Sequence, residues 1–162
     1  MMGEYEFITD KYVFFWNGIY SQWLPSNFTI DGITFNCCEQ YMMYKKAKLF
    51  GDDEIAEQIL LAKYPSDQKQ LGRKVKNFDR DKWDEHCFSY VYQGNYAKFS
   101  QNEELKNELL STGDRIIVEA SPYDKIWGIK MGVGDDYIEN PAHWRGLNLL
   151  GFAIMTVRKN LQ

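Results

Sequence analysis

The two charged side chains best placed for chemistry are Glu39 and Lys46, which lie in the largely apolar segment 37–50. The segment lacks Gly and Pro and is rich in helix-tolerant residues, so it predicts a helix. On that helix Lys46 returns to within about 20° of the face of Glu39, roughly 10 Å further along the axis. This separation is too long for a direct salt bridge. The carboxylate and the amine can instead converge on a ligand held between them, with Met42 and Met43 lining the gap.

The same spacing also fits a core helix that carries no site. A glutamate in the first turn of a helix is stabilised by the helix dipole, and a lysine can bury its stem while its ammonium group reaches water. A carboxylate in apolar surroundings is, however, usually kept only where something pairs with it. Spacing alone leaves both interpretations open.

A small basic patch follows further along the chain, at Arg73 and its neighbours Lys74 and Lys76. A guanidinium group matches the oxygens of a phosphate, so Arg73 is a candidate phosphate contact. The alternative is a solvated helix end.

The elements that must position these residues mix short strands with helices. Asp31-Gly32 predicts the turn of a hairpin, and Asn36 is a plausible N-cap for the helix over 37–50. The pattern predicts strands within 5–16, 28–35 and 116–118, and helices over 37–50, 54–62, 67–74, 81–99, from 102 or 103 to 111, and from 147 or 148 onward. With no linker or repeat, residues 1–162 are expected to form a single α+β domain, mostly helical around a small sheet.

Composition narrows the function classes. The 162 residues carry a net charge of −4, which disfavours a general nucleic-acid scaffold that works by neutralising phosphates. Aromatic residues make up 16%, enough for a core or for a pocket that accepts flat rings. Three Cys and two His show neither a disulfide framework nor a zinc pattern, so no metal is expected. The lack of a long apolar run or signal peptide predicts a cytoplasmic protein without membrane contact.

Several blocks in fixed order resemble the NADAR family over nearly the whole chain. The blocks are Phe15-Trp16 with Ser21-Gln22-Trp23, Cys38 to Met43 with Lys46-Ala47, Leu71-Gly72-Arg73 with Trp83, Lys98-Phe99, Leu109 to Asp114, Val118 to Gly128, and Trp144 to Gly151.

The resemblance implies an enzyme, an N-glycosidase that needs no cofactor. Members of the family act on phosphorylated amino-pyrimidine ribosylamines of riboflavin synthesis, or remove ADP-ribose from guanine. The implied partner is therefore a small nucleotide-like molecule or ADP-ribosylated guanine in nucleic acid. Two other classes are a non-catalytic module that binds ADP-ribose or a related nucleotide and a purely structural protein. A binding module would not need both Glu39 and Lys46.

The resemblance also implies catalytic roles for Glu39, Lys46 and Asp124. Lys46 would attack the sugar carbon and form a Schiff base, or water would attack with Lys46 stabilising the leaving group or a phosphate. Glu39 would be the general base or would stabilise an oxocarbenium charge. Asp124 would hold the ribose hydroxyls or protonate the departing amine. The alternative for Asp124 is to cap a turn beside Pro122.

The remaining implied roles concern binding. Trp127 is the expected stacking partner of the heterocycle, and Trp23 and Phe15 are further candidates, with core packing as the alternative for the last two. Gly128 would let the backbone approach the sugar or phosphate closely. Asn148 would either cap the last helix or leave the amides at its start facing a phosphate.

Overall fold

The computed structural model describes residues 6–162, which divide into two compact units. The helical unit comprises Pro25–Asn102, and the sheet unit comprises residues up to Leu24 together with Glu103–Gln162. The first residue of the predicted strand segment 5–16 lies outside the described residues.

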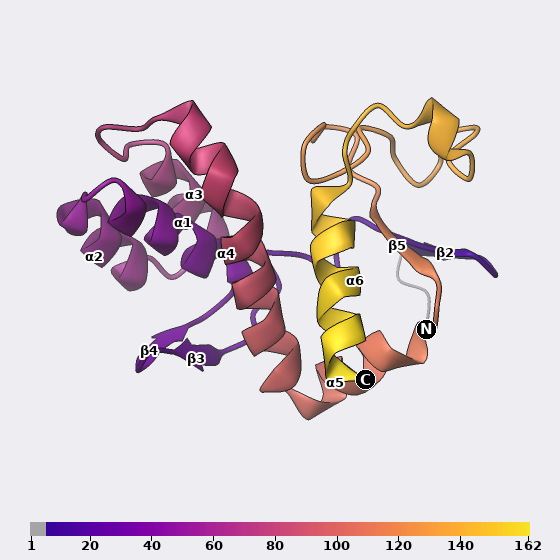
Figure 1. The fold of residues 1–162 in the computed structure, drawn as a ribbon, viewed down its shortest axis with the longest axis horizontal. Coiled ribbons are helices and arrows are strands. Elements are labelled where there is room, and N and C mark those ends of the chain that lie inside the picture. Colours follow the sequence, from indigo (N-terminus) through magenta and orange to yellow (C-terminus); the bar gives the residue numbers. More distant parts are fainter. Residues whose placement is uncertain (1–5) are drawn as a thin grey trace. The chain divides into compact units, whose positions relative to one another are not determined.

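The helical unit is a group of four helices with a β-hairpin (Figure 1). Helix α1 contacts the other three helices of the unit, and it also contacts strand β4. The elements are β3 (Phe28–Ile30), β4 (Ile33–Phe35), α1 (Cys38–Leu49), α2 (Asp53–Leu61), α3 (Pro65–Gly72) and α4 (Arg80–Ser100).

The hairpin forms where the sequence predicts it. Asp31 and Gly32, its two turn residues, have φ values of 52° and 79°, which a tight two-residue turn requires and which Asp and Gly tolerate. The strands carry Phe28 and Phe35 onto Tyr41 of α1, with the Phe35 and Tyr41 ring centroids 5.0 Å apart. This aromatic cluster fixes the first turn of α1 against the hairpin.

Helix α4 runs through Gly94 without a break, although a glycine inside a helix weakens it. A Cβ at this position would lie 3.1 Å from the Tyr41 ring, so the missing side chain makes room for α1. Helix α3 begins earlier than predicted, at Pro65. The first helical position needs no N–H donor, and the fixed φ of proline suits it.

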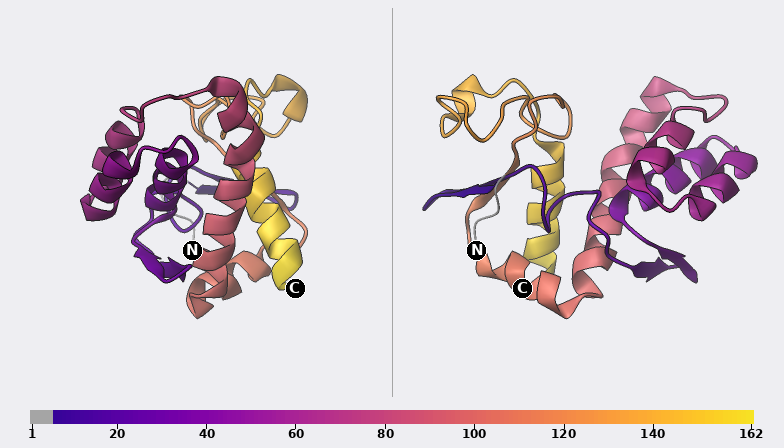
Figure 2. Two further views of the ribbon diagram at one scale, coloured as in Figure 1. Left: turned by 60° about the vertical axis from the view of Figure 1, so that its left-hand side comes forward. Right: turned by 180° about the vertical axis from the view of Figure 1, so that it is seen from behind.

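The sheet unit surrounds a three-stranded sheet in the order β1-β2-β5. Strand β2 is central, antiparallel to β1 and parallel to β5. Helix α6 packs against β5 and against α5 (Figure 2). The elements are β1 (Glu6–Ile8), β2 (Tyr12–Phe15), α5 (Glu103–Ser111), β5 (Ile116–Glu119), the 3₁₀ turn η1 (Pro141–His143) and α6 (Leu149–Leu161).

The core of the sheet unit has two parts. Ile117 of β5 and Leu150 and Ile154 of α6 have no exposed surface, and Val118, on the other face of β5, belongs to a second buried cluster with Phe14 and Ile129. The predicted buried strand is therefore confirmed and extends to Glu119. The described part of the chain has six α-helices and short strands, so the fold is α+β, as the sequence predicts.

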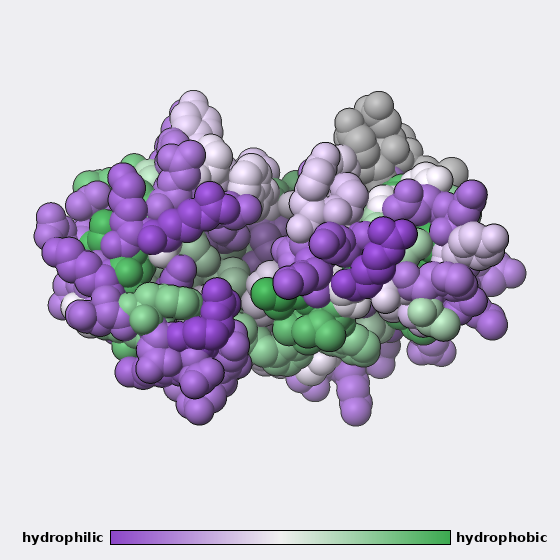
Figure 3. Space-filling view, turned by 90° about the horizontal axis from the view of Figure 1, so that it is seen from above, coloured by the Kyte–Doolittle hydropathy of each residue, from purple (hydrophilic) through white to green (hydrophobic). Residues whose placement is uncertain are grey.

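None of the helices within residues 6–162 is both long and apolar enough to cross a membrane. On the face drawn in Figure 3, hydrophilic residues cover much of the surface, with smaller apolar areas between them.

Candidate active site

The start of helix α1 is held by Gln40, the neighbour of Glu39. The Gln40 side-chain oxygen accepts a hydrogen bond from the Asn36 N–H at 2.7 Å, and its amide nitrogen donates to the Ile59 carbonyl oxygen at 3.0 Å. These bonds join the first turn of α1 to the end of α2. Glu39 is thereby fixed in that turn with only 7% of its surface exposed.

The residue before α1 is Cys37 rather than the predicted cap Asn36. The Asn36 side chain donates to the Lys63 carbonyl oxygen instead, and its side-chain oxygen accepts from the amide of Gln68. This amide network ties the end of α2 and the start of α3 to α1. The helix predicted over 37–50 is confirmed as Cys38–Leu49.

Lys46 lies two turns after Glu39, half-buried among aromatic rings. Its Nζ atom is 4.8 Å from the Phe78 ring centroid and 5.7 Å from that of Trp83. Burial lowers the pKa of Lys46, and the positive charges of Arg80 and Arg73 lower it further. An amine with a lowered pKa is uncharged, and hence nucleophilic, at a lower pH than an exposed lysine.

Glu39 opposes this effect, because its negative charge raises the pKa of Lys46. The Glu39 charge therefore acts on Lys46 along the helix, although their spacing excludes a direct salt bridge. Met42 and Met43, the residues predicted to line the gap, are each 7% exposed.

Arg73 is the C-cap of α3 and is exposed. Gly72, the last residue of α3, lies against Met43, and a side chain at 72 would overlap the Met43 sulfur. This close approach brings Arg73 near enough to lower the pKa of Lys46. Three predicted site residues, Glu39, Lys46 and Arg73, are thus electrostatically coupled within the helical unit.

The other predicted residues lie in the sheet unit. The Asp124 Oδ1 atom accepts hydrogen bonds from the N–H groups of Ile126 and Trp127, both at 2.9 Å. These contacts stabilise the turn that follows β5. The turn-capping role that the sequence offered as the alternative for Asp124 is thus one that it performs, and a catalytic role stays a prediction.

Trp127 is half-buried, and its carbonyl oxygen accepts from the Leu150 N–H at 3.1 Å. Next to it, a Cβ at Gly128 would lie 2.9 Å from the Glu119 carbonyl oxygen and 3.2 Å from that of Asp124. The close neighbours of Gly128 are therefore carbonyl oxygens of the protein itself, and its expected approach to a sugar or phosphate stays a prediction. The glycine lets the loop after β5 fold tightly.

Asn148 does not cap α6 with its side chain. It adopts a left-handed conformation with φ 53°, and its buried amide bonds to β5, accepting from the Glu119 N–H at 3.0 Å and donating to the Ile117 carbonyl oxygen at 3.0 Å. Asn148 is at the start of α6, as predicted, but the predicted side-chain cap is wrong, because the side chain bonds to the edge of β5 instead.

The backbone amides at the start of α6 are also occupied. The N–H groups of residues 147, 148, 149 and 150 donate to carbonyl oxygens of residues 125, 128, 126 and 127. A phosphate at this helix end would have to displace these bonds. The arrangement does not support the expected phosphate contact at Asn148, and it joins the loop 124–128 to α6.

We expect Asn148→Ala to lower the free energy of unfolding by about 2–4 kcal/mol, because one buried donor and one buried acceptor on β5 lose their partners. Urea denaturation followed by circular dichroism measures the change. The matched control is Asn140→Ala, which removes an exposed asparagine bonded to the Ala142 N–H. Equal losses in the two variants would contradict a special role for the Asn148 amide.

The remaining two aromatic candidates differ in accessibility. Phe15 has no exposed surface, and its ring centroid is 5.5 Å from that of Tyr20. Its assignment as a stacking residue is not supported, since it lies at the end of the central strand β2 and packs in the core. Trp23 is 43% exposed, and its indole ring stays a candidate for stacking.

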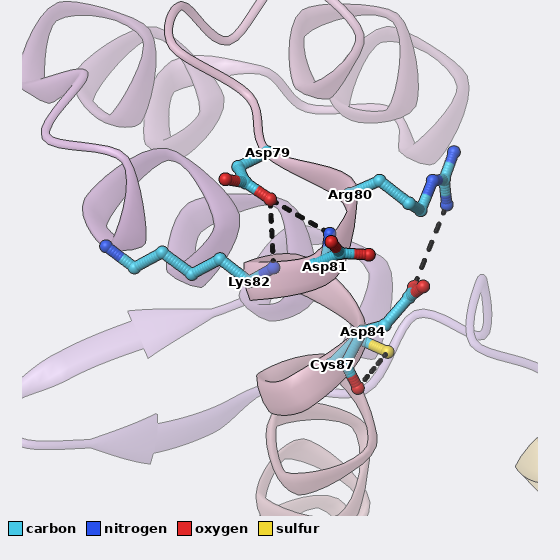
Figure 4. Close-up of polar contacts among 6 residues, drawn as sticks. All are labelled: Asp79, Arg80, Asp81, Lys82, Asp84 and Cys87. Atoms are coloured by element: carbon cyan, nitrogen blue, oxygen red, sulfur yellow. Dashed lines mark hydrogen bonds and ion pairs between the residues drawn. The ribbon is translucent and has the colours of Figure 1, made fainter.

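Sequence reasoning missed two residues that surround Lys46, Phe78 and Arg80. They precede and begin α4, where Asp79 caps the helix by accepting from the N–H groups of Asp81 and Lys82 (Figure 4). An aromatic residue and an arginine on either side of a helix cap were the available signal.

A third missed residue is Lys98, which has no exposed surface. Its Nζ atom lies 4.9 Å from the Phe99 ring centroid, and burial lowers its pKa. Within residues 6–162, no group of three or more His, Cys, Asp or Glu side chains is arranged to hold a metal ion.

The chain is similar to several known proteins. Residues 13–162 match the NADAR domain family, a match that runs through both compact units. The chain is 44% identical to N-glycosidase R617 of Acanthamoeba polyphaga mimivirus over 95% of its own length and 98% of the viral protein.

Two further relatives widen the comparison. One is N-glycosidase YbiA of Escherichia coli. Its NMR structure matches this chain with a TM-score of 0.77 at 26% identity, over 98% of this chain and 89% of the YbiA chain. The chloroplastic riboflavin biosynthesis protein PYRR of Zea mays is 32% identical over 81% of this chain, which matches only 20% of the maize protein.

Proposed function

This chain belongs to the NADAR family and is an enzyme that hydrolyses N-glycosyl bonds, and on that premise we propose which bond it cleaves. The proposed bond joins a ribosyl carbon to the exocyclic amine of a flat heterocycle. The heterocycle is an amino-pyrimidine carrying a ribosylamine phosphate, or guanine carrying ADP-ribose. Relatives named as riboflavin biosynthesis proteins support the first substrate.

The observation that carries the proposal is the environment of Lys46. The Lys46 amine is half-buried next to two aromatic rings. Burial is the main cause of its lowered pKa, and the charge of Arg80 is the next largest. Glu39 is fixed on the same helix, two turns away. A nucleophilic amine and a carboxylate suit substrates whose sugar carbon can form an imine.

In the proposed reaction, opening of the ribose ring converts the sugar carbon and the substrate nitrogen into an imine. The Lys46 amine attacks this carbon and forms a carbon–nitrogen bond. A water or substrate group held between the two side chains passes the proton of the attacking nitrogen to Glu39, and a proton passes to the departing amine as its bond to carbon breaks. Water then hydrolyses the lysine imine, which releases the sugar as an aldehyde and restores the free amine.

A direct attack by water is the alternative mechanism. Glu39 would then deprotonate the water, and Lys46 would act as a cation that stabilises the leaving group or a substrate phosphate. The lowered pKa of Lys46 favours the covalent route, because a residue that acts through its charge gains nothing from losing a proton more easily.

The binding roles stay predictions. Arg73 is exposed beside Lys46 and is proposed to bind a phosphate of the substrate, since its guanidinium group can form paired hydrogen bonds to phosphate oxygens. For Trp127, Trp23 and Asp124, contacts with the heterocycle and the ribose remain to be tested. A module that binds ADP-ribose without cleaving it is the less favoured function, because it needs no nucleophilic amine.

A direct comparison of the two substrates tests the proposal. The protein is incubated with an ADP-ribosylated guanine oligonucleotide and, separately, with the amino-pyrimidine ribosylamine phosphate, with EDTA present throughout. We expect chromatography to show release of the heterocycle and of an equimolar sugar aldehyde from at least one of them. Binding of either compound without release would favour the module instead, and release that requires an added divalent metal would contradict the proposed chemistry.

A further inference from the structure

The Phe78 ring contacts two cationic groups at once. The Lys46 Nζ atom lies 4.8 Å from the ring centroid, and the Arg80 Cζ atom lies 5.3 Å from it. The amine and the guanidinium group are therefore no further apart than the sum of these two distances. The ring packs edge-on against Phe50, with the centroids 5.3 Å apart, which limits its movement.

Arg80 keeps most of its charge unneutralised. Its nearest acidic partner, Asp84, is 3.9 Å away, and both side chains are more than half exposed (Figure 4). A solvated pair at this distance is weak. The positive charge of Arg80 consequently acts on its surroundings, including the half-buried Lys46.

The charged groups that act on Lys46 come from three neighbouring segments. Arg80 at the start of α4 and Arg73 at the end of α3 are positive, and Glu39 on α1 is negative. Aromatic rings favour the protonated amine, whereas partial burial and nearby cations disfavour it. Of the three charged groups, Arg80 has the largest influence.

We propose that Arg80, held on the Phe78 ring, is a positioning residue that disfavours protonation of the Lys46 amine and so increases its uncharged, nucleophilic fraction. Arg80 itself does not touch the reacting atoms in this scheme. A second cation near a lysine is an established way to favour the free amine, because protonation here would place two positive charges around one ring. The inference rests on the proposed function only for its catalytic consequence, and the electrostatic claim stands by itself.

The test measures the free amine directly, without turnover. Acetic anhydride acylates only uncharged amines, so the acylation rate of Lys46 at a fixed pH reports its uncharged fraction. Mass spectrometry compares this rate with that of the exposed Lys159 in the same sample. Arg80→Gln removes the positive charge, so the pKa of Lys46 rises and the uncharged fraction at neutral pH falls. We expect the acylation rate of Lys46 relative to Lys159 to fall by about two- to tenfold at low salt.

The chain offers a matched control in Lys82. Lys82 lies half a turn from Arg80, extends to the other side of the helix start in Figure 4, and has its Nζ atom 5.7 Å from the Phe50 ring centroid. Lys82→Gln removes the same formal charge, and Lys82 is not among the groups that shift the pKa of Lys46. Lys82→Gln should leave the acylation rate unchanged, and Arg80→Lys should stay close to the starting protein. Equal acylation in Arg80→Gln and Lys82→Gln would overturn the proposal.

The catalytic consequence has a separate readout. If Lys46 is the nucleophile, the acid limb of the kcat/KM pH profile should move to higher pH in Arg80→Gln and not in Lys82→Gln. A slower acylation of Lys46 with an unmoved pH profile would confirm the electrostatic role of Arg80 and reject Lys46 as the nucleophile. An unchanged acylation rate in an active enzyme would reject the role of Arg80 alone.

Discussion

Lys46→Arg is expected to remove turnover almost completely, by about 10³-fold or more, while leaving the protein folded. The substitution keeps a positive charge and a long stem beside the rings of Phe78 and Trp83. A guanidinium group, however, stays protonated at any physiological pH and cannot attack a carbon atom. Loss of activity with retained charge therefore separates a nucleophile from a simple cation.

Trapping of the intermediate is the measurement that goes with this variant. Borohydride added during turnover reduces an imine, so mass spectrometry should find the sugar attached to Lys46 and to no other lysine. The control is Lys45→Arg, one residue earlier on the same helix, where Nζ lies over the Tyr90 ring at 5.3 Å. Lys45→Arg should keep both activity and adduct. An active Lys46→Arg enzyme without an adduct would instead establish direct attack by water.

Glu39→Gln should slow turnover by about 10²- to 10⁴-fold, the range for loss of a positioned general base. The amide keeps the size and one acceptor of the carboxylate, so the first turn of α1 should keep its structure. Steady-state kinetics, on whichever of the two candidate substrates is cleaved, measures the loss. Glu57→Gln on the exposed face of α2 removes the same charge and should leave kcat unchanged.

The charge of Glu39 leads to a second expected result for Glu39→Gln: the acylation rate of Lys46 should rise while turnover falls. Because Glu39 raises the pKa of Lys46, its removal lowers that pKa further and increases the uncharged amine at neutral pH. Acylation of Lys46 should therefore become faster in Glu39→Gln even as turnover falls. If acylation and turnover both fell, a change in the protonation of Lys46 or misfolding would explain the loss of activity. That result would contradict the role of Glu39 as a base.

Local signals were sufficient for much of the fold. The absence of Gly and Pro predicted α1, the Asp31-Gly32 pair predicted the hairpin, and three β-branched residues predicted β5. The α+β class followed from these elements. That residues 1–162 form one domain stays a prediction, since the described chain divides into two compact units.

The features that were missed depend on contacts between distant residues. Gly94 is tolerated in α4 because Tyr41 needs the space. The sequence left core packing open for Phe15, and only the structure shows that its ring is buried against Tyr20. The neighbours of Lys46 could not be inferred either, because Phe78 before α4 and Arg80 at its start come more than thirty residues later in the chain.

The Asn148 amide also covers part of the exposed edge of strand β5. Strand β5 is at the edge of its sheet, where unpaired N–H and carbonyl groups would invite a strand from another molecule. On its outer side, Asn148 occupies the Ile117 oxygen and the Glu119 nitrogen, and the Ile129 N–H occupies the Glu119 oxygen at 3.0 Å. One side chain and one turn thus occupy three of the groups with which a further strand would pair, and we expect them to disfavour edge-to-edge association through β5.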